Sequence, residues 1–229
     1  MLPSLSVFFP CYNEEKNVRE LVLTAHQFLP TIAKKFEIII VNDGSSDRTA
    51  KIAQELIGEY PNIRLVSHTV NLGYGAALKT GIANARYEWT FWSDGDLQFD
   101  IKTLQSFMPY VEDYSAIIGY RAHRADTFIR KVNGELYTML INILFRLGVK
   151  DIDCAFKLIK TELLQSISIE SSSAFTSSEI LIRLKRKRIR FKQIPVSHFP
   201  RKRGNPTGGN IKVIFKGLRQ TLAFYFRTL

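Results

Sequence analysis

The chain has 229 residues, of which 45% are hydrophobic and 23% charged, a composition typical of a globular protein with a full-sized core. Its two cysteines, Cys11 and Cys154, are too few for a disulfide framework, and no apolar run approaches the ~20 residues that span a bilayer. These features exclude a disulfide-stabilised scaffold and a membrane-spanning bundle. We expect a reducing compartment and no signal peptide.

The net charge of +11 is unevenly distributed along the chain. Residues 1–115 carry 10 Lys and Arg against 14 Asp and Glu, whereas residues 116–229 carry 22 against 7. A front half of net charge −4 is therefore joined to a back half of net charge +15. This asymmetry predicts a polyanionic partner, which could be nucleic acid, an anionic membrane surface or a phosphorylated substrate.

The front half alternates predicted strands and helices. Short apolar runs predict the strands, and apolar residues at helical spacing predict the helices between them. Strands are expected at 5–9, 36–41, 63–67 and 88–93, with Pro10 ending the first, and helices at 13–29, 47–57 and 75–85. This alternation with short connections predicts an α/β fold: a mostly parallel sheet, doubly wound, with helices on both faces.

The back half is less regular. We expect strands at 116–119 and 191–196, a helix at 131–147, a helix ending at 180–186, a basic loop at 200–209 and an amphipathic helix from 210. The expected organisation is one domain at 1–209, divided into halves at 1–115 and 116–209. The helix at 210–229 then follows as an appendage.

Two acidic residues follow the fourth predicted strand. Asp94 and Asp96 come directly after the apolar run Trp89–Trp92, and α/β sheets bind ligands at the carboxyl ends of their strands. Carboxylates this close repel one another unless they share a cation, and a hard divalent ion prefers oxygen ligands. The alternative is a polar turn rich in Asp and Gly, with no metal.

Polar residues follow the other predicted strands as well. Asp43 is placed to accept hydrogen bonds from a nucleobase or ribose, whereas Asp47 is expected to cap the next helix. Glu14 favours a helix start by its charge alone. The Gly73 loop superficially resembles a dinucleotide-binding loop, but it follows the third strand and Leu78 stands in place of the final glycine, so an NAD site is not expected.

Four motifs in this order carry a family resemblance: residues 10–14, 42–45, 71–73 and 94–98. Together they resemble family 2 glycosyltransferases of the GT-A fold, and most closely the dolichyl- or polyprenyl-phosphate sugar synthases. The resemblance covers almost the whole chain, because it continues at residues 119–121, 151–157, 179 and 200–204. Ala155 departs from the pattern, where glycine is expected.

The resemblance implies an inverting transfer of a hexose from a nucleotide sugar to a lipid phosphate, with 1–209 as the catalytic domain, 1–115 as its nucleotide-sugar half and 116–209 as its acceptor half. It also implies roles for individual residues. Nucleotide-sugar binding is implied for Pro10, Tyr12, Glu14, Asp43, Gly73 and Asp94. Binding of Mg²⁺ or Mn²⁺ is implied for Asp96 and Gln98, with Asp94 beside them. Acceptor or diphosphate binding is implied for Arg121, Arg130, Lys131 and Arg201. Catalytic roles are implied for Asp96, Arg121, Asp151 and Asp153.

Asp151 and Asp153 have two possible roles. A sugar or protein hydroxyl as acceptor calls for a carboxylate general base. A lipid monophosphate is largely a dianion at neutral pH and needs only orientation and cationic contacts. The donor, guanine- or uracil-linked, is not decided by the sequence.

Two predicted helices combine basic and bulky apolar residues. The final helix, with Lys216, Arg219, Leu222 and Phe226, suits the membrane interface, and so does the helix containing Leu136, Leu140, Ile143, Leu144 and Leu147. Core packing is the alternative for each. We expect a peripheral protein at the cytoplasmic face of a membrane, with an anionic surface and a possible anchoring subunit or oligomer as partners. Nucleic acid is not an expected partner, because the basic residues do not alternate with stacking aromatics.

Overall fold

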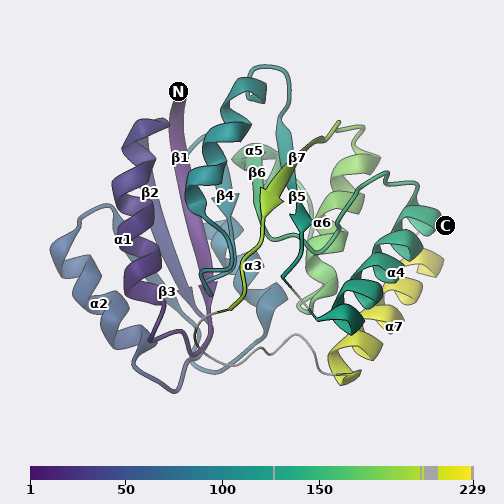
Figure 1. The fold of residues 1–229 in the computed structure, drawn as a ribbon, viewed down its shortest axis with the longest axis horizontal. Helices are drawn as coiled ribbons and strands as arrows, with labels where there is room; N and C mark the ends of the chain where they lie inside the picture. Colours follow the sequence, from purple (N-terminus) through teal and green to yellow (C-terminus); the bar gives the residue numbers. More distant parts are fainter. Residues whose placement is uncertain (126, 202, 204–210, 228–229) are drawn as a thin grey trace.

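The computed structural model describes residues 1–125, 127–201, 203 and 211–227 (Figure 1). Seven strands form one sheet in the order β3-β2-β1-β4-β6-β5-β7. β1 pairs in parallel with β2 and β4, β2 with β3, and β5 with β7, whereas β6 runs antiparallel to both β4 and β5. The predicted α/β fold with a mostly parallel sheet is therefore confirmed.

The elements have the following bounds. The strands are β1 (Leu2–Cys11), β2 (Ala33–Asn42), β3 (Ile63–Ser67), β4 (Trp89–Trp92), β5 (Ala116–His123), β6 (Lys157–Lys160) and β7 (Lys192–Ser197). The helices are α1 (Val18–Phe28), α2 (Thr49–Glu59), α3 (Tyr74–Asn84), α4 (Phe128–Phe145), α5 (Thr161–Gln165), α6 (Phe175–Arg186) and α7 (Ile211–Arg227), with 3-10 helices η1 (Leu29–Thr31) and η2 (Ile101–Tyr110).

The sheet has a hydrophobic core on each face, because successive side chains of a strand point to opposite faces. Along β1, Val7 and Phe9 pack with α1, α2 and η2, while Phe8 packs on the other face with α3. Helices α4, α5, α6 and α7 also contribute buried residues to that second core. Helices thus cover both faces, as the alternating sequence pattern predicts.

Two predicted boundaries are wrong for physical reasons. Pro10 does not end β1 but lies within it, opposite Val41 of β2. The pairing with β4 reaches only to Phe8, so the missing amide of Pro10 breaks no bond on that side. The first helix begins at Val18 rather than at 13 or 14, because the amide of Glu14 donates to Thr49 Oγ1 across a neighbouring loop.

β6 and η2 are absent from the elements predicted by the sequence. β6 has four residues and two lysines, Lys157 and Lys160, and its apolar signal is correspondingly short. β6 lies between β4 and β5 in the sheet, and pairing with these two strands stabilises it. The predicted strands at 116–119 and 191–196 are found, as longer or shifted segments, in β5 and β7.

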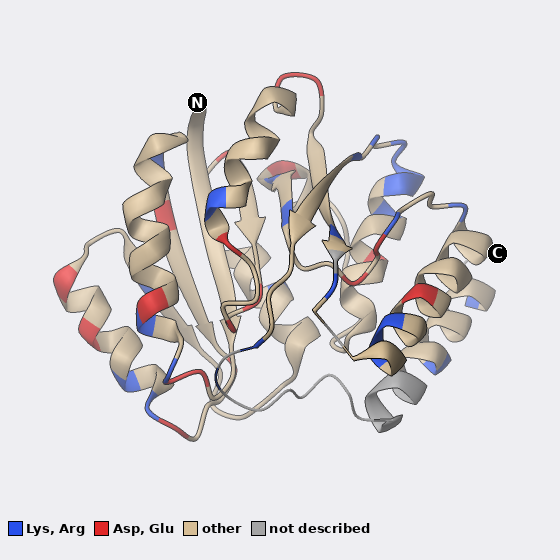
Figure 2. Cartoon of the chain, in the orientation of Figure 1, with Lys and Arg blue, Asp and Glu red and all other residues tan. Residues whose placement is uncertain are grey.

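α4 and α7 lie side by side at one end of the sheet (Figure 1). Thr221 and Phe224 of α7 are buried, whereas Leu222 and Phe226 are exposed. Basic residues recur over α4, α6 and α7 (Figure 2), on the half of the molecule that carries the excess positive charge. None of the helices in the described part of the chain is long and apolar enough to cross a membrane.

Candidate functional site

The parallel strands bring the sequence motifs to one edge of the sheet. The segments that follow β1, β2, β3 and β4 meet there, together with residues 198–201 that follow β7. Gly95 allows the loop after β4 to cross the end of β1, since a Cβ at that position would lie 2.8 Å from the Pro10 carbonyl oxygen and 3.0 Å from Cys11 Sγ. The edge is therefore closely packed around the two carboxylates of that loop.

Asp94 and Asp96 form an electrostatically coupled pair. Burial, followed by the charge of Asp96, raises the pKa of Asp94 to about 7, against opposing contributions from Tyr74, Arg121 and Lys157. Burial also raises the pKa of Asp96, against the opposing effects of the Gln98 amide and Arg201. The raised pKa values show that the nearby cationic side chains do not fully neutralise the two carboxylates. A bound cation would therefore stabilise their ionised forms.

Arg201 connects this pair to the amino-terminal loop. Its Nη2 lies 2.6 Å from Glu14 Oε1 and its Nη1 lies 3.3 Å from Asp96 Oδ2. The other oxygen of Glu14 accepts a hydrogen bond from Asn17 Nδ2 at 2.6 Å. Burial raises the pKa of Glu14, while Asn17 and Arg201 oppose the rise. Glu14 is thus held in a buried polar network, and its predicted contact with a nucleotide stays a prediction.

Asp43 organises the loop before α3. Its carboxylate accepts hydrogen bonds from the amides of Leu72 and Gly73, both at 2.9 Å, and lies 2.6 Å from Nδ1 of His68. Gly73 has a φ of 94°, a conformation that favours glycine. Asp43 therefore shapes the Gly73 loop directly, and nucleoside binding by Asp43 stays a prediction.

The residues at this edge fit a divalent cation. No group of three or more His, Cys, Asp and Glu suited to a metal occurs among the described residues. The available donors are the carboxylates of Asp94 and Asp96 and the side-chain oxygen of Gln98, whose Nε2 donates to the Phe199 carbonyl at 2.9 Å. Mg²⁺ is commonly bound by one or two carboxylates together with substrate phosphates, so this small donor set is sufficient for a metal–diphosphate complex.

Arg121 and Asp151 form a buried bidentate ion pair beside the acidic loop. Arg121 Nε lies 2.6 Å from Oδ2 and Nη2 lies 2.8 Å from Oδ1, and the Arg121 amide donates to Oδ2 at 3.2 Å. Although burial acts to raise it, these bonds hold the pKa of Asp151 below its ordinary value. A carboxylate stabilised as an anion is a poor proton acceptor, so the geometry favours an orienting role over a general base.

Asp153 differs from Asp151 in its environment. The residue as a whole is exposed, but burial of its carboxyl group raises the pKa of Asp153, with Arg121 opposing the rise and the charge of Asp151 adding to it. Of the two, Asp153 is the better candidate for accepting a proton.

Lys157 is a functional candidate outside the predicted site residues, although it lies in the motif at 151–157. It is fully buried, and its Nζ donates to the carbonyls of Ile152 and Cys154 and to Ser177 Oγ. Burial lowers the pKa of Lys157. Through these carbonyls Lys157 holds the loop that carries Asp151 and Asp153. A lysine directly before the apolar residues Leu158 and Ile159 is the sequence signal that points to it.

The remaining predicted residues lie around the same edge. Tyr12 is 39% exposed directly after β1. Arg130 and Lys131 lie in the first turn of α4, partly buried, and the charge of Arg130 opposes the raised pKa of Asp96. The structure thus brings Arg130 within electrostatic reach of the acidic pair, and a role for Lys131 stays a prediction.

Comparison with known sequences gives the family context. The profile of Glycosyl transferase family 2 matches residues 6–168. The chain is 32% identical to glycosyltransferase AglD of Haloferax volcanii, over 86% of this chain and 33% of that protein. It is 33% identical to a dolichyl-phosphate beta-glucosyltransferase of Dictyostelium discoideum, over 69% of this chain and 54% of that protein. A dodecaprenyl-phosphate galacturonate synthase of Rhizobium johnstonii is 30% identical, over 72% of this chain and 50% of that protein.

The chain spans between a third and two thirds of the length of such relatives. Among solved structures, glucosyl-3-phosphoglycerate synthase from Mycobacterium tuberculosis in complex with Mn²⁺, UDP and glucosyl-3-phosphoglycerate superposes with a TM-score of 0.71 at 18% identity, over 97% of this chain and 80% of that one. The same enzyme with phosphoglyceric acid gives a TM-score of 0.73. The GT-A-like fold is therefore shown.

Proposed function

Because this chain belongs to glycosyl transferase family 2, we propose that it transfers a hexose from a nucleotide sugar to a polyprenyl or dolichyl phosphate. The proposed reaction inverts the anomeric centre, uses a GDP- or UDP-linked donor and depends on Mg²⁺ or Mn²⁺. The observation that carries this proposal is the Asp94–Asp96 pair at the end of β4, whose carboxylates resist ionisation beside the guanidinium of Arg201.

We assign the donor to the edge formed by the loops after β1 to β4. Asp96 and Gln98 would hold the metal, with Asp94 beside them, and the metal would neutralise charge on the diphosphate as it leaves. The nucleoside would lie against Pro10, Tyr12, Glu14, Asp43 and Gly73. The relative that supports a UDP donor with Mn²⁺ is the M. tuberculosis synthase, whose structure contains both.

We assign the acceptor phosphate to the basic residues around the acidic pair. Arg121, fixed by Asp151, presents a rigid cation there, and Arg130, Lys131 and Arg201 add positive charge. A phosphate dianion is itself the nucleophile, so it needs to be oriented but not deprotonated. The low pKa of Asp151 agrees with that requirement.

The acceptor would be reached at a membrane surface. Exposed apolar side chains on α4 and α7 lie within the basic half of the protein, a combination that suits an anionic interface. We place the protein peripherally on the cytoplasmic face, with residues 1–209 as the catalytic unit and 210–229 as an interfacial helix. An anchoring subunit or an oligomer would also hold the protein at the membrane surface.

The proposal is tested with a panel of nucleotide sugars, a polyprenyl phosphate and Mn²⁺, scored by release of the nucleoside diphosphate. We expect release with one donor class, and a loss of at least ~100-fold in Asp96→Asn because the metal ligand is neutralised. Asp113→Asn, which removes an exposed carboxylate after η2, is the matched control and is expected to retain the activity. Transfer that is equally fast without divalent metal would contradict the proposal.

A transferase acting on a sugar or protein hydroxyl is the second candidate, and the raised pKa of Asp153 favours it, because a base needs a pKa closer to neutrality. Asp151→Asn and Asp153→Asn distinguish the two. With a lipid phosphate acceptor, we expect Asp151→Asn to lower the rate at all values between about pH 6 and about pH 9, with no rescue at high pH. A pH-dependent defect confined to Asp153→Asn would instead identify a general base and a hydroxyl acceptor.

A further inference from the structure

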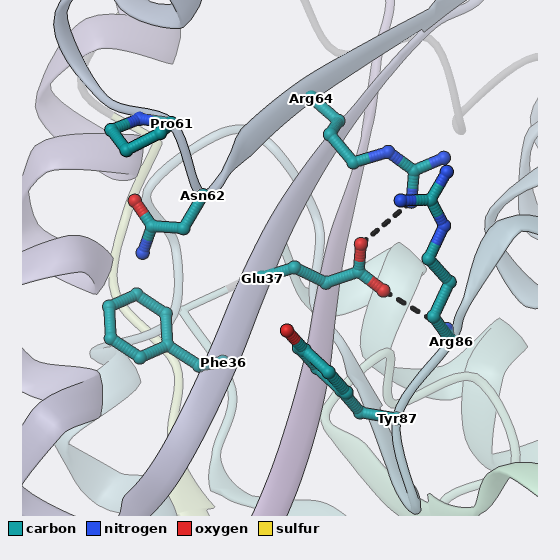
Figure 3. Close-up of a pocket in the computed structure, with 7 residues that line it drawn as sticks. All are labelled: Phe36, Glu37, Pro61, Asn62, Arg64, Arg86 and Tyr87. Atoms are coloured by element: carbon teal, nitrogen blue, oxygen red, sulfur yellow. Dashed lines mark hydrogen bonds and ion pairs between the residues drawn. The ribbon is translucent and has the colours of Figure 1, made fainter.

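A pocket lies beside the starts of β3 and β4, away from the candidate active site. It has a volume of about 250 Å³ and is lined by Phe36, Glu37, Pro61, Asn62, Arg64, Arg86 and Tyr87 (Figure 3). Glu37 lies in the middle of β2 and Arg64 near the start of β3, whereas Asp43 follows the end of β2. Six residues of extended strand separate Glu37 from Asp43, which corresponds to about 20 Å.

A buried carboxylate fixes the floor of this pocket. Glu37 Oε1 accepts hydrogen bonds from Ser6 Oγ at 2.7 Å and from the Arg86 amide at 3.0 Å, while Oε2 lies 2.7 Å from Arg64 Nη1. The same Nη1 donates to the Asn84 carbonyl at 3.2 Å. The position of Arg64 is therefore set by the protein alone, before any ligand binds.

The charged side chains that line the pocket carry a net positive charge. The side chains of Arg64 and Arg86 extend toward each other above Glu37 (Figure 3), and only the backbone of Arg86 contacts that carboxylate. One carboxylate therefore faces two guanidinium groups. Guanidinium groups present planar sets of N–H donors that match phosphate and carboxylate oxygens.

One wall of the pocket is aromatic. Tyr87 lies beside Glu37, whereas the side chain of Phe36 lies on the other side of β2 (Figure 3). Two adjacent cations beside an aromatic side chain match a ligand with an anionic end and a planar apolar end. We propose that this pocket binds a small organic phosphate, with the phosphoryl group between Arg64 and Arg86 and the planar group against Tyr87.

The test uses phenyl phosphate as the probe and isothermal titration calorimetry as the measurement. Arg86→Ala is the informative variant, because it removes the guanidinium but keeps the backbone amide that bonds Glu37. Arg86 is exposed, so unchanged thermal unfolding in the absence of ligand is expected. We expect binding of phenyl phosphate by the unmodified protein and a loss of at least about tenfold in affinity in Arg86→Ala.

Two further variants identify where the probe binds. Arg188→Ala removes an exposed arginine after α6 and is expected to leave the affinity unchanged. Arg201→Ala tests whether the probe binds at the candidate active site instead. Absence of binding, or binding that is weakened by Arg201→Ala and not by Arg86→Ala, would overturn the proposal.

Two further probes test the chemical class of the ligand. Benzoate and phenol keep the aromatic ring but replace the phosphate with a carboxylate or with a neutral hydroxyl. We expect both to bind more weakly than phenyl phosphate. Equal affinity for benzoate would reassign the pocket to carboxylates, and equal affinity for phenol would show that the guanidinium groups contribute nothing. Either result would overturn the assignment to phosphates.

Discussion

Asp94 connects the stability of the protein to pH. Its pKa rises from 3.8 to about 7 on folding. The unfolded chain therefore loses this proton above about pH 4, whereas the folded chain keeps it until near pH 7. Across this window the unfolded state binds fewer protons, so Asp94 lowers the free energy of unfolding as the pH rises.

We expect Asp94→Asn to remove much of that decline. The difference in the free energy of unfolding between about pH 5 and about pH 8 should be smaller by at most about 3 kcal/mol than in the unmodified protein, because roughly two pKa units separate pH 5 from the folded pKa and each corresponds to ~1.4 kcal/mol. Urea unfolding at both pH values without metal measures it, with Asp113→Asn as the control for loss of one carboxylate. An identical pH dependence in Asp94→Asn and the unmodified protein would show that Asp94 ionises normally.

Lys157 allows a test of a buried cation within β6. Lys157→Met leaves the carbonyls of Ile152 and Cys154 without their donor, so we expect the free energy of unfolding to fall by about 2–4 kcal/mol. Lys160→Met is the matched control in the same strand. Lys160 is partly exposed and lies 3.7 Å from Glu88, so its replacement should cost less than about 1 kcal/mol. Equal losses in urea unfolding would show that Lys157 has no special structural role.

At the level of the elements, the sequence predicts the sheet better than its connections. β1 to β4 are recognised from apolar runs that end in polar loops, since central parallel strands are buried on both faces. β6 lacks such a signal because it is short and is stabilised by pairing with β4 and β5, which are distant in the chain. The late start of α1 likewise depends on hydrogen bonds to the loop before α2, which no local pattern encodes.

The packing of α3 against the sheet gives a prediction for two helical glycines. A Cβ at Gly81 would overlap the ring of Phe8 in β1, whereas a Cβ at Gly58 in α2 would meet nothing within 4 Å. We expect Gly81→Ala to destabilise the protein by about 1–3 kcal/mol through overpacking. Gly58→Ala should stabilise it by about 0.5–1 kcal/mol, because alanine favours the helix. Thermal unfolding of both variants measures the contrast, and equal shifts would contradict this packing.

At the scale of the whole molecule, the distribution of apolar surface tests the proposed membrane contact. Leu136 and Ile143 on α4 are 54% and 67% exposed, whereas Leu147 is buried, so the predicted apolar helix face is only partly available. We expect flotation of the protein with anionic vesicles, and a loss of at least about tenfold in partitioning when Leu136 and Ile143 are replaced by serine. Val70→Ser, at an exposed position after β3, is the control. Failure of the unmodified protein to float would contradict an interfacial role for α4.

Contacts between the two halves of the chain are what the sequence cannot provide. The four motifs of the front half predict that Asp94 and Asp96 lie near Asp43, because parallel strands end at one edge. Nothing local predicts that Arg201 pairs with Glu14, since the two are 187 residues apart. The same holds for Gln98 and Phe199, whose backbones bond each other across the edge.

The separation of Glu14 and Arg201 along the chain also has a consequence for synthesis. On the ribosome, the acidic loops of the front half emerge first and remain without this cation until residue 201 has left the exit tunnel. Contacts of such long range are costly in loop entropy and tend to form late in folding. The candidate active site is therefore completed only after β7 has been synthesised, so a nascent chain that stops before β7 would carry the acidic pair but not the guanidinium that balances it.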